Sequence, residues 1–111
     1  MSGVLKSFDH YALNYNAVKP TDTGKSIVEM GCYSGTTPVA WIYFYPDGAT
    51  LPSNTVNSSG MIQLCYEIKR FNDIITIMRY EKPLTIWADS VTGGGMVSSG
   101  TTELIGQQEG V

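Results

Sequence analysis

At 111 residues the chain has the length of one domain with a single modest core, and no composition break divides residues 1–111. Seven basic against ten acidic residues give a net charge of −3 without a basic stripe, so we expect no nucleic-acid partner. No apolar run reaches the roughly 18 residues of a membrane span, so we expect no membrane association. The N-terminus lacks an apolar signal region, which predicts a cytoplasmic protein.

The first part of the chain predicts three strands. Residues 10–18 alternate in character and place Tyr11 and Tyr15 on one face, the pattern of a half-buried strand. Residues 25–33 and 38–45 predict the second and third strands. Because the connections between them are too short for crossovers, we expect an antiparallel meander.

The second part predicts a helix between strands. Residues 61–67 form a fourth predicted strand. In IKRFNDIITIMRYEKP, apolar residues recur at i, i+3, i+4 and i+7, which predicts an amphipathic helix at about 69–81 that ends before a proline. Residues 84–89 predict a fifth strand and residues 96–106 a last one. The predicted fold is therefore α+β, with one helix packed on a mostly antiparallel sheet of five to six strands. The sheet is expected to be strongly curved, with a partly open barrel as the alternative form.

The predicted strand 38–45 is apolar on both faces. Ile42 and Phe44 point to one face, and alternating tryptophan and tyrosine residues point to the other. The helix covers one face, so the other must meet the interior of a curled sheet, a ligand or another subunit. All three interpretations stay open. The candidate ligand or interface residues are Trp41, Tyr43, Tyr45, Tyr11, Tyr15 and Trp87.

Asp47 follows this strand in the sequence Pro46-Asp47-Gly48. Proline presets φ, aspartate caps or tolerates the turn, and glycine supplies a positive φ where one is required. These properties account for all three residues without chemistry. We therefore interpret Asp47 as a turn residue.

Other catalytic candidates lack a recognised spacing. His10 follows Asp9, but neighbouring residues of a strand point to opposite faces, so Asp9 is not expected to orient the imidazole. Glu29 and Glu67 would form a general acid/base pair only if both turned inward. The sequence has no G-x-S-x-G nucleophile motif. We expect no catalytic residues.

The two cysteines, Cys32 and Cys65, are not part of a C-x-x-C motif. With one histidine they are too few for a typical zinc site, so we expect free thiols and neither a metal nor a cofactor. Gly93-Gly94-Gly95 lacks the lysine and serine or threonine of a phosphate-binding loop and predicts a hairpin turn instead.

The segments WIYFYPDG (41–48) and YEKPLTIW (80–87), followed by a glycine-punctuated strand, resemble small uncharacterised bacterial proteins, some of them carried on mobile gene cassettes. The resemblance covers about the middle half of the chain. It implies a compact, oligomeric α+β domain with no assigned activity, and it transfers no functional residue.

The leading interpretation is a non-enzymatic interaction module that forms a homodimer or larger homo-oligomer through an aromatic sheet face. Only 15% of residues are charged, against roughly 25% in typical domains, so copies repel one another weakly. One alternative is a binding protein whose aromatic cavity takes an apolar or aromatic small molecule. A less favoured alternative is a small enzyme that uses Glu29, Glu67 or Asp47 beside His10.

Overall fold

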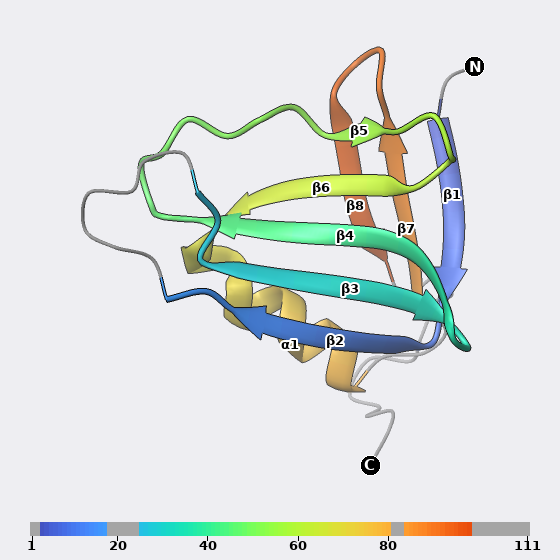
Figure 1. Ribbon diagram of the computed structural model, residues 1–111, viewed down its shortest axis with the longest axis horizontal. Helices are drawn as coiled ribbons and strands as arrows, with labels where there is room; N and C mark the ends of the chain where they lie inside the picture. Colours follow the sequence, from blue (N-terminus) through green and yellow to red (C-terminus); the bar gives the residue numbers. More distant parts are fainter. Residues whose placement is uncertain (1–2, 18–24, 81–83, 99–111) are drawn as a thin grey trace, which may run out of the picture.

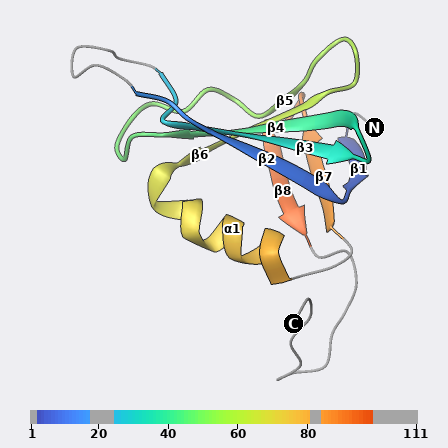
Figure 2. The same cartoon turned by 60° about the horizontal axis from the view of Figure 1, so that its bottom comes forward.

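A computed structural model describes residues 3–17, 25–80 and 84–98 (Figure 1). In this part of the chain, eight strands form one five-stranded and one three-stranded sheet. A short helix packs on the larger sheet, on the same side as the smaller sheet (Figure 2). The α+β class predicted from the sequence is confirmed.

The five-stranded sheet has the order β2-β3-β4-β6-β5. Its strands are β2 (His10–Tyr15), β3 (Val28–Ser34), β4 (Thr37–Tyr45), β6 (Ile62–Glu67) and β5 (Thr55–Val56). Antiparallel pairing of β2 with β3 and of β3 with β4 confirms the predicted meander. The turn from β3 to β4 contains Gly35 at φ 62°, a conformation that favours glycine. The parallel pairing of β4 with β6 was not predicted.

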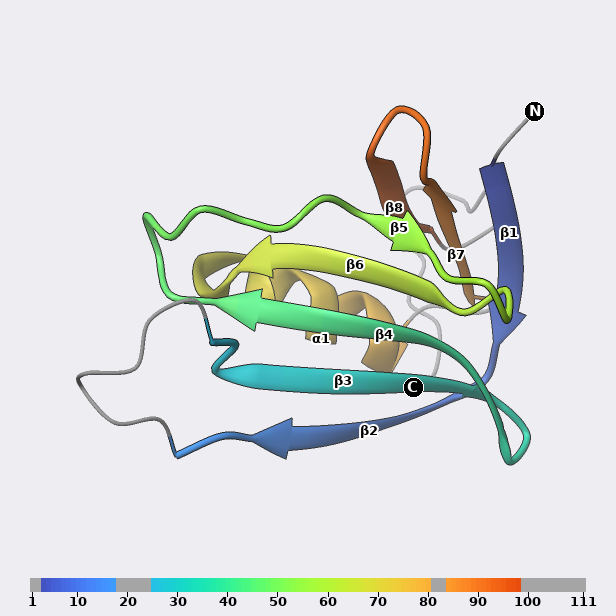
Figure 3. The same cartoon turned by 45° about the horizontal axis from the view of Figure 1, so that its top comes forward.

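The three-stranded sheet is antiparallel throughout and has the order β1-β7-β8. Its strands are β1 (Gly3–Phe8), β7 (Leu84–Asp89) and β8 (Gly94–Ser98). They run across the strands of the larger sheet (Figure 3). Only Asp9 separates β1 from β2, so the chain leaves one sheet and enters the other at this residue.

The helix begins with a 3-10 turn, η1 (Ile68–Arg70), and continues as α1 (Phe71–Tyr80). Ile74 and Met78 lie one turn apart on the same face, and both are buried. This confirms an amphipathic helix where the apolar spacing predicted it. The observed α-helix starts two residues later than predicted because the first turn is 3-10, and residue 81 lies outside the described residues.

The core lies between the inner face of the five-stranded sheet and the elements that cover it. The fully buried side chains of this face are Val28, Met30, Cys32, Ala40, Ile42, Phe44, Ile62 and Leu64. The helix contributes Phe71, whose ring meets that of Phe44 edge to face at 5.2 Å. The smaller sheet contributes Ile86 and Ala88, which are also fully buried.

The predicted single, strongly curved sheet or partly open barrel is wrong, because the strands form two sheets and neither is closed or strongly curled. The prediction missed β1, which pairs with β7 and so builds a separate sheet with β7 and β8. The sequence did not predict β1 because its residues do not alternate between apolar and polar: Lys6 lies on the same face as the buried Phe8. The last predicted strand is observed as β8, and residues 99–106 lie outside the described residues.

Candidate functional site

The outer face of the five-stranded sheet carries Trp41, Tyr43 and Tyr45, the orientation predicted from the alternation along β4. Each of the three is half-buried, whereas Ile42 and Phe44 between them are fully buried. The helix and the smaller sheet both lie on the other side of this sheet (Figure 2). We call this surface the aromatic face, defined by Trp41, Tyr43, Tyr45 and Tyr33.

Gly31 makes room for two of these rings. A Cβ atom at this position would lie 3.0 Å from Cε1 of Tyr33 and 3.1 Å from Cη2 of Trp41. The two rings therefore converge above the glycine, where any side chain would displace them. Sequence reasoning did not select Tyr33, although its position on β3, two residues after Gly31, places it on the same face.

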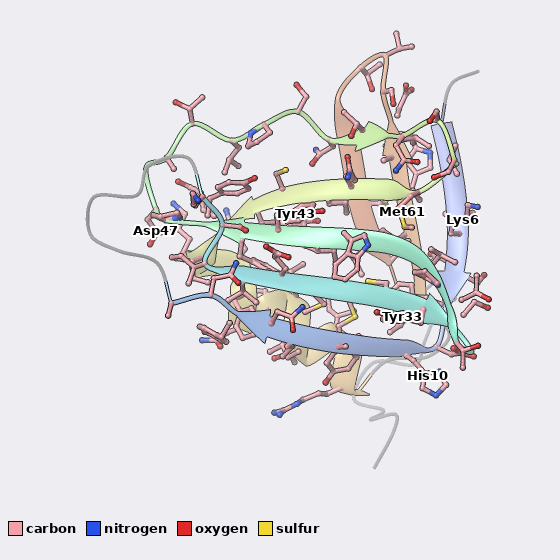
Figure 4. The ribbon with its side chains drawn as sticks, viewed as in Figure 1. Lys6, His10, Tyr33, Tyr43, Asp47 and Met61 are labelled. Atoms are coloured by element: carbon pink, nitrogen blue, oxygen red, sulfur yellow. The ribbon has the colours of Figure 1, made fainter. Side chains whose placement is uncertain are left out.

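Polar side chains lie beside the aromatic rings on β6. Tyr43 pairs in register with Cys65, and Gln63 lies two residues before Cys65 on the same face of β6. The Thr55 hydroxyl donates to Oε1 of Gln63 over 3.0 Å. Figure 4 shows Tyr43 near the middle of the face, between β4 and β6. This side of the aromatic face therefore offers amide and hydroxyl groups.

A carboxylate lies on the β3 side. Glu29 pairs in register with Tyr43, and its Oε2 atom accepts from Nδ2 of Asn16 over 3.1 Å and from Oγ of Ser26 over 3.4 Å. Among the described residues, Glu29 forms no ion pair. Neutral donors thus hold the carboxylate in place while its negative charge has no basic partner in this part of the chain.

This environment raises the pKa values of two tyrosines, Tyr43 and Tyr45. Burial raises the pKa of Tyr43, and the charge of Glu29 raises it further. The pKa of Tyr45 is also raised, first by burial and then by the nearby Cys65, Tyr43 and Glu29. Both phenols therefore stay neutral to higher pH than a free tyrosine.

The other predicted members of the aromatic surface lie elsewhere. Tyr11 and Tyr15 are on the helix side of β2, in register with the inward-facing Cys32 and Val28. The ring of Tyr15 meets that of Phe71 edge to face at 6.1 Å. Trp87 lies on the smaller sheet. The structure thus divides the six candidates among three surfaces and brings only three of them together.

Trp87 belongs to an exposed row on the outer face of the three-stranded sheet. Leu5, Trp87 and Met96 are paired in register across β1, β7 and β8, and we call them the apolar row. Leu5 is 66% exposed and Met96 is 52% exposed. Gly3 and Gly94 lie beside the indole, where a Cβ atom would be 2.6 Å and 3.3 Å from its ring.

Asp47 has a structural role beyond the turn. Its Oδ1 atom accepts from the backbone N–H of Lys69 over 3.1 Å, at the start of the helix. The N–H of Gly48, at φ 83°, donates to Oε2 of Glu67 over 2.8 Å. These two hydrogen bonds tie the end of β4 to the beginning of the helix, and the turn interpretation of Asp47 needs no catalytic role.

The expectation that Asp9 does not orient His10 is wrong. Nδ1 of His10 lies 2.7 Å from Oδ1 of Asp9, which also accepts from the N–H of Gly35 over 2.8 Å. The strand argument fails because Asp9 lies at the step between the two sheets rather than within a strand. Both side chains are mostly exposed, and the bonds stabilise this step.

Cys32 and Cys65 are free and lie on opposite faces of the sheet, with β4 between their strands, so they cannot form a disulfide with each other. Burial raises the pKa of the Cys32 thiol to about 12. The described residues contain no group of three or more histidine, cysteine or acidic side chains able to hold a metal ion. Among the same residues, no helix has the length and apolar character needed to cross a bilayer.

Comparisons with known proteins returned no matching family model, curated protein or solved structure. The resemblance to cassette-borne bacterial proteins therefore stays a prediction. The function has to be argued from the two outer sheet faces themselves.

Proposed function

We propose that the protein is a non-enzymatic interaction module that forms a homodimer through the apolar row of its three-stranded sheet. The observation that supports this is the register of Leu5, Trp87 and Met96, which sets three large apolar side chains in one line across the sheet. Two of them are more than half exposed. Contiguous exposed apolar side chains are typical of interaction sites.

The composition of this surface suits a protein partner. Tryptophan and methionine are enriched in interface cores, and charged residues are depleted there. On one side of the row the neighbouring outward positions Ser7, Thr85 and Ser98 carry small hydroxyl groups, and on the other side the neighbours are Gly3, Gly94 and the charged Asp89. Trp87 occupies the middle of the row, where a binding hot spot is expected.

A second copy fits the row because the row can pair with itself. Trp87 lies on the central strand, with Leu5 on one side and Met96 on the other. A two-fold axis along β7 would bring each Leu5 over the partner's Met96 and stack the two indoles. The two indoles form the uncharged centre of this contact, and the Asp89 residues of the two copies face each other at one end of it.

The expected dimer is weak. Strands of five or six residues rise about 3.3 Å per residue and lie about 4.8 Å apart, so the face measures on the order of 20 Å by 15 Å. This is small beside the roughly 800 Å² that each partner buries in a standard interface. We therefore expect a Kd on the order of 100 μM.

Sedimentation velocity between about 20 and 500 μM tests the proposal, because this range brackets the expected Kd. The wild-type protein should show a concentration-dependent shift from monomer to dimer. Leu5→Glu should remain monomeric, because it places a charge in the contact. Leu51→Glu is the matched control, since Leu51 is also exposed, at 37%, but lies in the loop before β5.

A wild-type protein that stays monomeric over the whole range would contradict the proposal. Equal dissociation by Leu5→Glu and Leu51→Glu would also contradict it. If Tyr43→Glu dissociates the dimer and Leu5→Glu does not, the interface belongs to the aromatic face instead.

A further inference from the structure

The aromatic face carries a carboxylate, Glu29, that has no basic partner among the described residues. Glu29 lies in register with Tyr43, and Tyr43 lies two residues from Trp41 on the same face of β4. The faces of aromatic rings carry partial negative charge and attract cations. The rings and the carboxylate therefore favour the same sign of ligand.

We propose that the aromatic face binds an organic cation of the quaternary or methylated ammonium class, with Trp41 and Tyr43 as the aromatic contacts and Glu29 as the counter-charge. This proposal is independent of self-association, because the apolar row lies on the other sheet.

Charge complementarity excludes the main competing ligands. The whole chain carries a net charge of −3, and the carboxylate of Glu29 would repel a phosphate or a nucleic acid. The rings of Trp41 and Tyr33 both lie close to Gly31 and are half-buried within the chain itself. A small cation resting on the exposed side of these rings requires no rearrangement.

The hydrogen-bonding state of the face selects the type of cation. The Oε2 atom of Glu29 already accepts hydrogen bonds from Asn16 and Ser26. A primary ammonium must replace the water molecules bonded to its N–H groups. A quaternary ammonium has no N–H groups, so ring faces and one fixed carboxylate satisfy it.

The site is open, so binding is expected to be weak. Cation–π contacts at exposed positions are small, and a single neighbouring carboxylate adds to them through partly screened charge. We expect a Kd on the order of several millimolar for tetramethylammonium. This range is accessible to nuclear magnetic resonance titration of the full chain.

The experiment follows amide and indole N–H resonances of the uniformly ¹⁵N-labelled protein as tetramethylammonium chloride replaces sodium chloride at constant ionic strength. We expect saturable shifts in β3 and β4 and at the indole N–H of Trp41, with Trp87 unaffected. tert-Butanol, a neutral molecule of similar size, should give no saturable shifts in these strands.

Two charge variants separate a local site from the general field of the protein. Glu29→Gln removes the charge but keeps an oxygen that can accept from Asn16 and Ser26, and we expect affinity to fall about tenfold. Asp73→Asn removes one exposed negative charge from α1, on the opposite side of the sheet, and should leave the affinity unchanged.

Several results would overturn the proposal. Equal loss of affinity in Glu29→Gln and Asp73→Asn would show only general electrostatic attraction. Equal binding of tert-butanol would show that the ligand's charge plays no part. Saturable shifts with maltose and none with tetramethylammonium would assign the face to neutral sugars. None of these results depends on whether the protein dimerises.

Discussion

The outer faces of the two sheets share one construction, a tryptophan on the middle strand that lies over glycine in a neighbouring strand. In the larger sheet Trp41 of β4 lies over Gly31 of β3. In the smaller sheet Trp87 of β7 lies over Gly3 of β1 and Gly94 of β8. Glycine in a strand often marks a close approach by another group, and here that group is an indole ring.

The faces differ in what surrounds the tryptophan. Around Trp41 lie half-buried tyrosines, an amide and the carboxylate of Glu29. Around Trp87 lie the exposed apolar side chains of Leu5 and Met96, and Asp89 is the next outward residue of β7. The same arrangement, a tryptophan ring over glycine, therefore occurs in two kinds of surface. The flanking residues determine whether charge or apolar area dominates.

The distinction between a binding surface and a core would be wrong if the aromatic face were a second core. Ile42→Ala should lower the free energy of unfolding by about 2–5 kcal/mol, because Ile42 is fully buried in the inner core. Tyr43→Ala, the next residue on the outer face, should cost only about 1 kcal/mol. Urea denaturation measures both, and similar losses would show that the outer aromatics are core residues.

Glycine substitutions test whether the aromatic rings need the space that glycine leaves beneath them. Gly31→Val should lower the free energy of unfolding by about 1–3 kcal/mol, because a side chain there meets both Tyr33 and Trp41. Gly94→Ala should stay within about 0.5 kcal/mol, since its nearest ring atom would be 3.3 Å away on an exposed surface. Thermal or urea unfolding of the pair checks this, and a larger effect at Gly94 would contradict it.

Truncation of each tryptophan separates the two binding roles. Trp87→Ala should weaken self-association about tenfold, or about 1.4 kcal/mol, because it removes the centre of the apolar row. Trp41→Ala should leave the dimer unchanged and weaken tetramethylammonium binding. Sedimentation and nuclear magnetic resonance titrations of both variants, with circular dichroism to verify folding, make the test. Loss of both activities in either variant would mean that the faces are not independent.

Alkaline pH gives the smallest expected effect. Because burial and Glu29 raise the pKa of Tyr43, the folded state favours the neutral phenol. That contribution is complete below the unfolded pKa of 10.0 and is lost as pH rises from there through the raised folded value. Tyr43→Phe should therefore lose less stability above pH 10.0 than the wild type, measured by urea midpoints. An unchanged alkaline profile would show that Tyr43 does not contribute.

Much of the secondary structure could be predicted because local patterns determine it. The alternation of Ile42 and Phe44 with Trp41 and Tyr43 correctly predicts the two faces of β4. The helical spacing of Ile74 and Met78 likewise predicts the buried face of α1. These patterns follow from the geometry of a single strand or helix.

The pairing of distant strands and the division of the site could not be predicted. Nothing in the segment GVLKSF indicates that it pairs with residues 84–89, and the inward position of Lys6 hides its alternation. Because β7 pairs with β1 in the smaller sheet, Trp87 lies on that sheet and not on the aromatic face. Tyr33 could have been found from its alternation with Gly31, but its contact with Trp41 depends on the register of β3 and β4.

The step at Asp9 also affects how the chain can fold. The strands β1 and β2 lie directly before and after Asp9, but their partners lie at very different distances along the chain. Strand β2 pairs with β3, the next strand in the sequence, whereas Val4 in β1 pairs with Ala88. The meander can form through local contacts, but β1 must close a loop that contains most of the chain. Long-range pairing of this kind slows folding. During synthesis, β1 should therefore stay unpaired until β7 has left the ribosome, and the apolar row would be the last surface to be assembled.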